Sequence, residues 1–165
     1  MKNIYLDLDG VVANFDEFVE NIIGHAPPID KKFTEQDWLE ILKHPRLFRD
    51  LNVYEGAGNF VRAISQLANE YNYDLKFLTA VSRKNDMPWS FIDKIHWVEK
   101  HFPGIPVWFG PYSADKHLHA TVGDILIDDR ITNIIRWNQA GGVGILHSSS
   151  FSQTLCCVEH LLTYR

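Results

Sequence analysis

The stretch "IYLDLDGVVANF" (Ile4 to Phe15) carries two aspartates, Asp7 and Asp9, at the end of an apolar run that stops at Gly10. Such a short apolar run is typical of a buried β-strand. Burying an unpaired carboxylate is costly, so the aspartates either reach the surface at this point or are neutralised by a partner. The stretch therefore predicts a core strand whose end carries an acidic pair in need of an explanation.

Composition limits the class of protein. The 165 residues suit one domain with a small insertion, and 45% hydrophobic and 22% charged residues are ordinary for a soluble globular chain. The net charge of −5 and the lack of a basic tract argue against binding to nucleic acid. We recognise no apolar run of membrane-spanning length and no signal peptide, so we expect no membrane association. The adjacent Cys156 and Cys157 make a poor structural disulfide, which favours a cytoplasmic location.

Five short apolar segments, each bounded by Gly, Pro, Asp or Ser, are predicted to be strands. They are residues 3–9, 74–80, 105–110, 124–129 and 142–147, and helical patterns cover residues 57–71, 90–102 and 131–142. In the second of these helices we expect Phe91, Ile95 and Val98 to form the buried face. Strands that alternate with helices predict an α/β three-layer sandwich around a mainly parallel five-stranded sheet.

The segment between the first two strands is longer than one crossover helix needs. Within it, "NFDEFVENIIG" (residues 14–24) reads as a helix that ends at Gly24, and "TEQDWLEILKH" (residues 34–44) as a second helix with Thr34 as its N-cap. We therefore predict a small helical cap inserted after the first strand. Residues 1–13 and 73–165 are assigned to the core, and residues 14–72 to the cap.

Polar side chains gather at the carboxyl ends of the predicted strands, the edge at which ligands of open α/β sheets bind. Residues two apart in a strand point to the same face, so Asp7 and Asp9 are expected together. The other members are Thr79, which ends the second strand, Lys116, which follows the third, and Asp128 and Asp129, which end the fourth. Alone, each could be a helix cap, a turn former or a surface lysine. Together, the carboxylates are hard oxygen ligands that favour a Mg²⁺ site, and such a site would receive a phosphate.

Four parts of the sequence, "DLDGVVANF", "FLTA", Lys116 and "ILIDDR", resemble the motifs of haloacid dehalogenase-type phosphohydrolases. Beyond them, "LFRDLNVYEGA" (residues 47–57) and "KIHWVEKHF" (residues 94–102) are similar to stretches of the 5'(3')-deoxyribonucleotidases. This resemblance implies a Rossmann-like core. It also implies Mg²⁺-dependent hydrolysis of (deoxy)nucleoside monophosphates through an aspartyl-phosphate.

The resemblance also implies a role for each residue of the set. Asp7 would be the nucleophile, and Asp9 would act first as general acid and then as general base. Thr79 and Lys116 would hold the phosphoryl oxygens. The implied Mg²⁺ ligands are Asp7, the backbone carbonyl of Asp9, and Asp129, with Asp128 in support.

Four further residues would contact the substrate by the same resemblance: Phe15, Phe48, Ala80 and Lys94. Trp38 is an additional aromatic candidate in the cap. Aromatic rings can stack on a nucleobase, although a small helical cap also needs apolar filling of this kind. The chain departs from the nucleotidase pattern at two positions, with Ala114 in place of an arginine and His117 in place of a threonine.

Two alternatives to a nucleotidase stay open. The first is a phosphatase of the same chemistry that acts on another small phosphomonoester or on a nucleic-acid 3'-phosphate end, the latter disfavoured by the acidic net charge. The second is a non-catalytic phosphoacceptor module, which also uses acidic residues, a threonine and a lysine on a parallel sheet. Asp9 has no role in a stable phosphoacceptor, so its presence favours turnover. A homodimer is left open.

Overall fold

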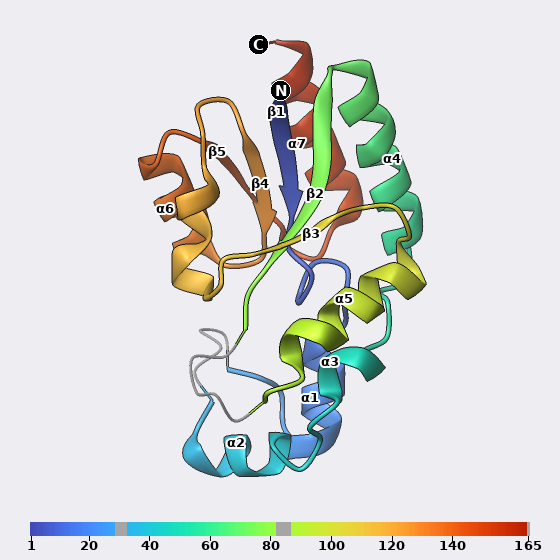
Figure 1. Cartoon of the computed structure of the whole chain (residues 1–165), viewed down its shortest axis with the longest axis vertical. Coiled ribbons are helices and arrows are strands. Elements are labelled where there is room, and N and C mark those ends of the chain that lie inside the picture. The colour runs from blue at the N-terminus through green and yellow to red at the C-terminus, as the bar shows by residue number, and fades with distance from the viewer. Residues whose placement is uncertain (29–32, 82–86, 165) are drawn as a thin grey trace.

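A computed structural model describes residues 1–28, 33–81 and 87–164. Its centre is a five-stranded sheet in the order β3-β2-β1-β4-β5 (Figure 1), and every pair of neighbouring strands is parallel. The strands are β1 (Lys2–Leu6), β2 (Tyr73–Thr79), β3 (Val107–Phe109), β4 (Ile125–Asp128) and β5 (Val143–Leu146). The predicted α/β fold with a mainly parallel five-stranded sheet is confirmed.

Helices cover both faces of the sheet because its strands are apolar on both sides. Ile4 and Leu6 of β1 lie in the larger core cluster, which α4 (Ala57–Glu70), α5 (Ser90–His101) and α7 (Phe151–Thr163) help to form. Tyr5 points the other way and packs against Trp137, with ring centroids 5.4 Å apart. Trp137 belongs to α6 (Ile131–Gln139), which lies beside the 3₁₀ helix η1 (Ser113–His119). In the part of the chain that the structure describes, no helix is both long and apolar enough to cross a membrane.

The first strand is shorter than predicted. β1 ends at Leu6, and the backbone then turns, because the Leu8 carbonyl accepts hydrogen bonds from the N–H groups of Val12 and Ala13 at 2.9 and 2.8 Å. Asp7 stays beside β4 through its N–H, which donates to the Ile127 carbonyl at 2.9 Å. Strand alternation therefore does not orient Asp7 and Asp9 as expected, since both lie in the loop after β1, although both line the same cleft.

Three helices form a layer beyond the carboxyl edge of the sheet: α1 (Phe15–Ile23), α2 (Glu35–Ile41) and α3 (Leu47–Asp50) (Figure 1). Thr34 caps α2 as predicted, and its side chain accepts a hydrogen bond from the N–H of Asp37. By contrast, α4 packs against β2 and α7, so this part of residues 14–72 lies with the sheet. Residues 29–32 of the predicted cap lie outside the described residues, and the division into core and cap stays a prediction.

The buried face of α5 differs from the expected one. Phe91 is 45% exposed, whereas the charged Asp93 and Lys94 are almost fully buried, together with Trp97 and Val98. Of the expected apolar face, Val98 is buried, Ile95 is partly exposed and Phe91 is exposed, so the apolar period describes the buried face only in part. The reason is that α5 packs against α3 and against the loop after β1. Asp93 forms an ion pair with Arg46, the residue before α3, and Lys94 forms one with Asp9 of the loop.

Candidate active site

Asp7 is buried and neutralised by a lysine from a distant part of the chain. The ammonium group of Lys116, only 2% exposed, lies 2.7 Å from Oδ2 of Asp7 and 2.7 Å from Oδ2 of Asp128. The second oxygen of Asp7, Oδ1, accepts a hydrogen bond from the N–H of Leu8 at 2.8 Å. These contacts fix the Asp7 carboxylate in place. They also supply part of the charge compensation that a buried carboxylate requires.

The ionisation of this group is strongly perturbed. The pKa of Asp7 is raised to about 8, mainly by burial; Lys116 opposes this rise, and the neighbouring carboxylates of Asp128, Asp129 and Asp9 add to it. Burial alone would lower the pKa of Lys116, but its ion pairs with Asp128 and Asp7 outweigh this effect and raise that pKa. One lysine thus leaves an excess of negative charge, which a bound cation would relieve.

Asp7, Asp128 and Asp129 can each offer one carboxylate oxygen within 4.8 Å of the others. Asp128 is fully buried, and its oxygens accept hydrogen bonds from Lys116, from the Arg130 N–H at 2.8 Å and from Nδ2 of Asn133 at 3.0 Å. Asp129 instead lines the cleft. Clustered carboxylate oxygens of this kind fit Mg²⁺, with Asp129 more accessible than Asp128 as a direct ligand.

Gly10 allows the loop after β1 to approach the acidic cluster. Its φ of 80° lies in the left-handed region, which favours glycine. A Cβ atom at this position would also collide with the carboxylate of Asp129. Both the backbone conformation and the available space therefore require glycine immediately after Asp9.

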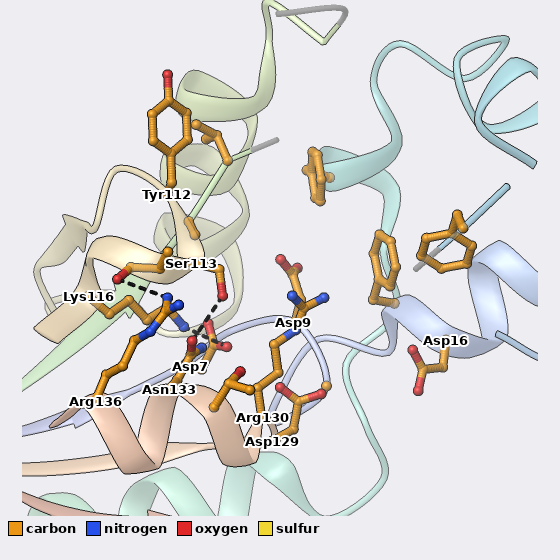
Figure 2. A pocket seen from close by; sticks show the side chains of 18 of the residues that line it. Asp7, Asp9, Asp16, Tyr112, Ser113, Lys116, Asp129, Arg130, Asn133 and Arg136 are labelled. Atoms are coloured by element: carbon orange, nitrogen blue, oxygen red, sulfur yellow. Dashed lines mark hydrogen bonds and ion pairs between the residues drawn. The ribbon is translucent and has the colours of Figure 1, made fainter. Parts of the chain in front are cut away.

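A cleft of about 390 Å³ opens over this edge of the sheet (Figure 2). Its charged lining consists of Asp7, Asp9, Asp16, Asp129, Lys116, Arg130 and Arg136, and its aromatic lining includes Phe15, Phe33, Trp38 and Phe48. The rings of Phe15 and Phe48 are nearly parallel, with centroids 6.1 Å apart and planes inclined by 14°. The cleft therefore joins a polar region that suits a phosphate to an aromatic region that suits a flat apolar group.

Two predicted residues lie just behind this lining. Thr79 is fully buried at the end of β2, and Lys94 of α5 is 2% exposed. The Lys94 ammonium forms an ion pair with Asp9 and donates a hydrogen bond to Oγ1 of Thr79 at 2.9 Å. Neither residue is among the described residues that line the cleft.

The structure thus brings Asp7, Asp128, Asp129 and Lys116 into one cluster. It places Asp9, Phe15, Phe48 and Ala80 in the cleft wall. Sequence reasoning missed Asn133 and the two arginines of the α6 segment. All three residues follow β4 closely in the sequence. Because the segment after β4 starts at the carboxyl edge of the sheet, this position could have indicated that they reach the site. Arg136 also lies beside Ala114, whose carbonyl accepts a hydrogen bond from Nη1 at 3.4 Å. A basic group therefore lies next to the position at which this chain has Ala114 in place of the arginine of the nucleotidase pattern.

Comparisons with known proteins support the resemblance to the 5'(3')-deoxyribonucleotidases. A Staphylococcus epidermidis protein provisionally named 5'(3')-deoxyribonucleotidase is 32% identical over 91 residues, which cover 55% of this chain and 45% of the relative. A Staphylococcus aureus (strain Mu50) protein with the same provisional name is 28% identical over 142 residues, 78% of this chain and 73% of the relative. The chain thus spans about half the length of the first relative. A hydrolase from Streptococcus pneumoniae TIGR4 shares the fold, with a TM-score of 0.54 and 14% identity over 95% of this chain and 99% of the hydrolase.

The parallel sheet and the aspartates at the ends of β1 and β4 fit the class that the sequence resembles, the haloacid dehalogenase-type hydrolases, and the family model supports this class. The chain belongs to the family described as 5' nucleotidase, deoxy (pyrimidine), cytosolic type C protein, whose model matches residues 1–158. The resemblance predicted from the sequence is therefore confirmed.

Proposed function

We propose that the protein is a Mg²⁺-dependent phosphomonoesterase that hydrolyses (deoxy)nucleoside monophosphates to nucleoside and phosphate. The observation that carries this proposal is a buried aspartate, Asp7, paired with Lys116 at the polar side of a cleft whose other side is aromatic. Family membership and the provisional names of the staphylococcal relatives support it. A cytoplasmic location and a homodimer stay predictions.

In the first chemical step, a carboxylate oxygen of Asp7 attacks phosphorus, and the bond from phosphorus to the nucleoside oxygen breaks. Asp9 protonates the departing oxygen, which leaves as a hydroxyl group. The contact between Oδ1 of Asp7 and the Leu8 N–H holds the nucleophile in orientation. Lys116, which lines the cleft, stabilises the phosphoryl oxygens on which charge accumulates, and the buried Thr79 supports this edge of the site through its contact with Lys94.

In the second step, water attacks the phosphorus of the aspartyl-phosphate, and the bond from phosphorus to the Asp7 oxygen breaks. Asp9, now ionised, accepts the proton of this water, so the residue returns to its starting state. Inorganic phosphate then leaves through the cleft.

The donor set supports a single divalent cation held by Asp7, Asp129 and the backbone carbonyl of Asp9. Asp128 would support this set from behind, since Lys116 and Asn133 already occupy its oxygens. The chemistry that the cation supplies when bound is charge neutralisation and orientation of the phosphoryl group.

Release of inorganic phosphate from a panel of substrates tests the proposal. The panel contains deoxy- and ribonucleoside 5'- and 3'-monophosphates, sugar phosphates and an oligonucleotide with a 3'-phosphate, each with Mg²⁺ and with EDTA. We expect the highest kcat/KM on a nucleoside monophosphate, no turnover in EDTA, and recovery when Mg²⁺ is restored. A preference for a sugar phosphate or the oligonucleotide would favour the first alternative, and a stable phosphoprotein without phosphate release would favour the phosphoacceptor module.

The aromatic side of the cleft predicts a specific effect of Phe15→Ala. Phe15 is only partly buried and lines the cleft, so a base stacked on its ring would lose about 1–3 kcal/mol of stabilisation. We expect this loss in kcat/KM for a deoxynucleoside monophosphate and a much smaller one for a small aryl phosphate. Steady-state kinetics on both substrates measure the difference.

A matched control for Phe15→Ala is Phe18→Ala on the same helix. Phe18 packs in the cap, edge-on to His44 at 6.3 Å, and is not among the described residues of the cleft wall. This variant is expected to lower the Tm without changing the ratio between the two substrates. An equal loss on both substrates in Phe15→Ala, with a lowered Tm, would mean that Phe15 only fills the cap.

A further inference from the structure

The ammonium group of Lys94 is enclosed by three protein partners. A lysine offers three N–H donors. One is directed to Oδ2 of Asp9, and a second to Oγ1 of Thr79 at 2.9 Å. The ring of Phe48, whose centroid is 4.3 Å from Nζ, occupies the remaining side, and the residue is 2% exposed.

We propose that Lys94 is a positioning residue, which holds Asp9 in the orientation that catalysis needs and does not itself contact the substrate. The proposal deepens the proposed function and rests on it. It also differs from the substrate-binding role that the family resemblance implies for Lys94.

The contacts of Lys94 leave one carboxylate oxygen of Asp9 available. Asp9 has one oxygen held by the ammonium, and its second oxygen, Oδ1, has no hydrogen-bond donor among the described residues. The Asp9 side chain is 28% exposed and lines the cleft, so this second oxygen is available for proton transfer. Thr79 is fully buried and accepts a hydrogen bond from Lys94, so it anchors the ammonium from the side away from the cleft.

Lys94 is itself held by contacts between α5 and the cap. The adjacent Asp93 is fully buried, and Nε of Arg46 donates to both of its oxygens, at 3.0 and 2.8 Å. One turn further along α5, Nε1 of Trp97 donates to the Leu51 carbonyl at 2.8 Å. These contacts fix the segment of residues 46–51, and with it the Phe48 ring over Lys94. The same helix therefore positions the general acid and one wall of the substrate cleft.

A double-mutant cycle of Lys94→Met and Asp9→Asn tests the proposal. Loss of positioning is expected to lower kcat/KM of Lys94→Met for a deoxynucleoside monophosphate by about 10²-fold. If Lys94 acts through Asp9, the double variant loses no more than Asp9→Asn alone, within about twofold. Single-turnover formation of the phosphoenzyme from nitrophenyl phosphate, whose leaving group needs little protonation, is expected to fall much less in Lys94→Met.

Stability supplies a second readout. Asp9→Asn leaves the buried ammonium without its ionic partner and is expected to lower the Tm, whereas the double variant regains part of this loss. Lys100→Met, which removes an exposed lysine from the last turn of the same helix, is the matched control and is expected to keep wild-type kinetics. If Lys94→Met does not fold, the same cycle with Lys94→Gln takes its place.

Losses that multiply in the double variant would overturn the proposal, since Lys94 would then act independently of Asp9, for example directly on the phosphate. An equal loss on nucleotide and nitrophenyl phosphate in Lys94→Met would overturn it as well. Failure of the proposed function is a different result, because the unmutated protein would then release no phosphate from any nucleotide.

Discussion

The Asp7→Asn variant is expected to release no phosphate from any substrate while keeping the native fold. The amide is nearly isosteric with the carboxylate but cannot attack phosphorus, so the covalent route is closed. The buried ammonium of Lys116 keeps Asp128 as an ionic partner at 2.7 Å, and the single amide oxygen can accept from the Leu8 N–H or from Lys116, but not from both. Phosphate release over several hours at saturating Mg²⁺, together with circular dichroism, measures both outcomes.

The stability of the Asp7→Asn variant carries information of its own. Burial and the nearby carboxylates of Asp128, Asp129 and Asp9 raise the pKa of Asp7 to about 8. Removing this charge relieves the crowding, so the Tm without metal is expected to equal or exceed that of the unmutated protein. Asp74 lies at the end of β2 away from Thr79, and its side chain is 43% exposed. Asp74→Asn is therefore the control, and its activity is expected to be unchanged. Turnover near the wild-type rate in Asp7→Asn would exclude an aspartyl-phosphate formed on this residue.

The acidic cluster was predictable from the sequence because its members follow short apolar strands. Parallel strands place their carboxyl ends at one edge, so aspartates after the first and fourth strands have to meet. Lys116 could be assigned to the same edge for this reason. The sequence could not show that its ammonium bridges Asp7 and Asp128, since that depends on how η1 packs against α6.

Lys94 shows where sequence reasoning ends. Hydrophobic periodicity favoured a buried face with Phe91, yet the fold buries Lys94 and Asp93 and leaves Phe91 45% exposed. Periodicity detects apolar burial only. It is insensitive to charged residues that are buried because a distant partner neutralises them, here Asp9 for Lys94 and Arg46 for Asp93. Such partners lie 85 and 47 residues away in the chain and become visible only in the folded structure.

Asp9→Asn is the second variant with a large expected effect. Asp9 serves as acid in the first step and as base in the second, so its loss is expected to slow both. Loss of general acid–base catalysis costs about 10²–10⁴-fold in rate. Rapid-quench measurements that separate formation of the phosphoenzyme from its breakdown test both roles on a deoxynucleoside monophosphate.

The leaving group separates the acid role of Asp9 from a general disturbance of the site. A nucleoside leaves as a strongly basic alkoxide unless Asp9 protonates it, whereas nitrophenolate leaves readily without a proton. In Asp9→Asn, formation of the phosphoenzyme is therefore expected to fall far less with nitrophenyl phosphate than with a nucleotide. Its breakdown is the same reaction for both substrates, so that step is expected to slow equally. An equal loss in formation for the two substrates would contradict the acid role, because misplacement of the phosphate by the unpaired Lys94 would then be sufficient to explain the defect.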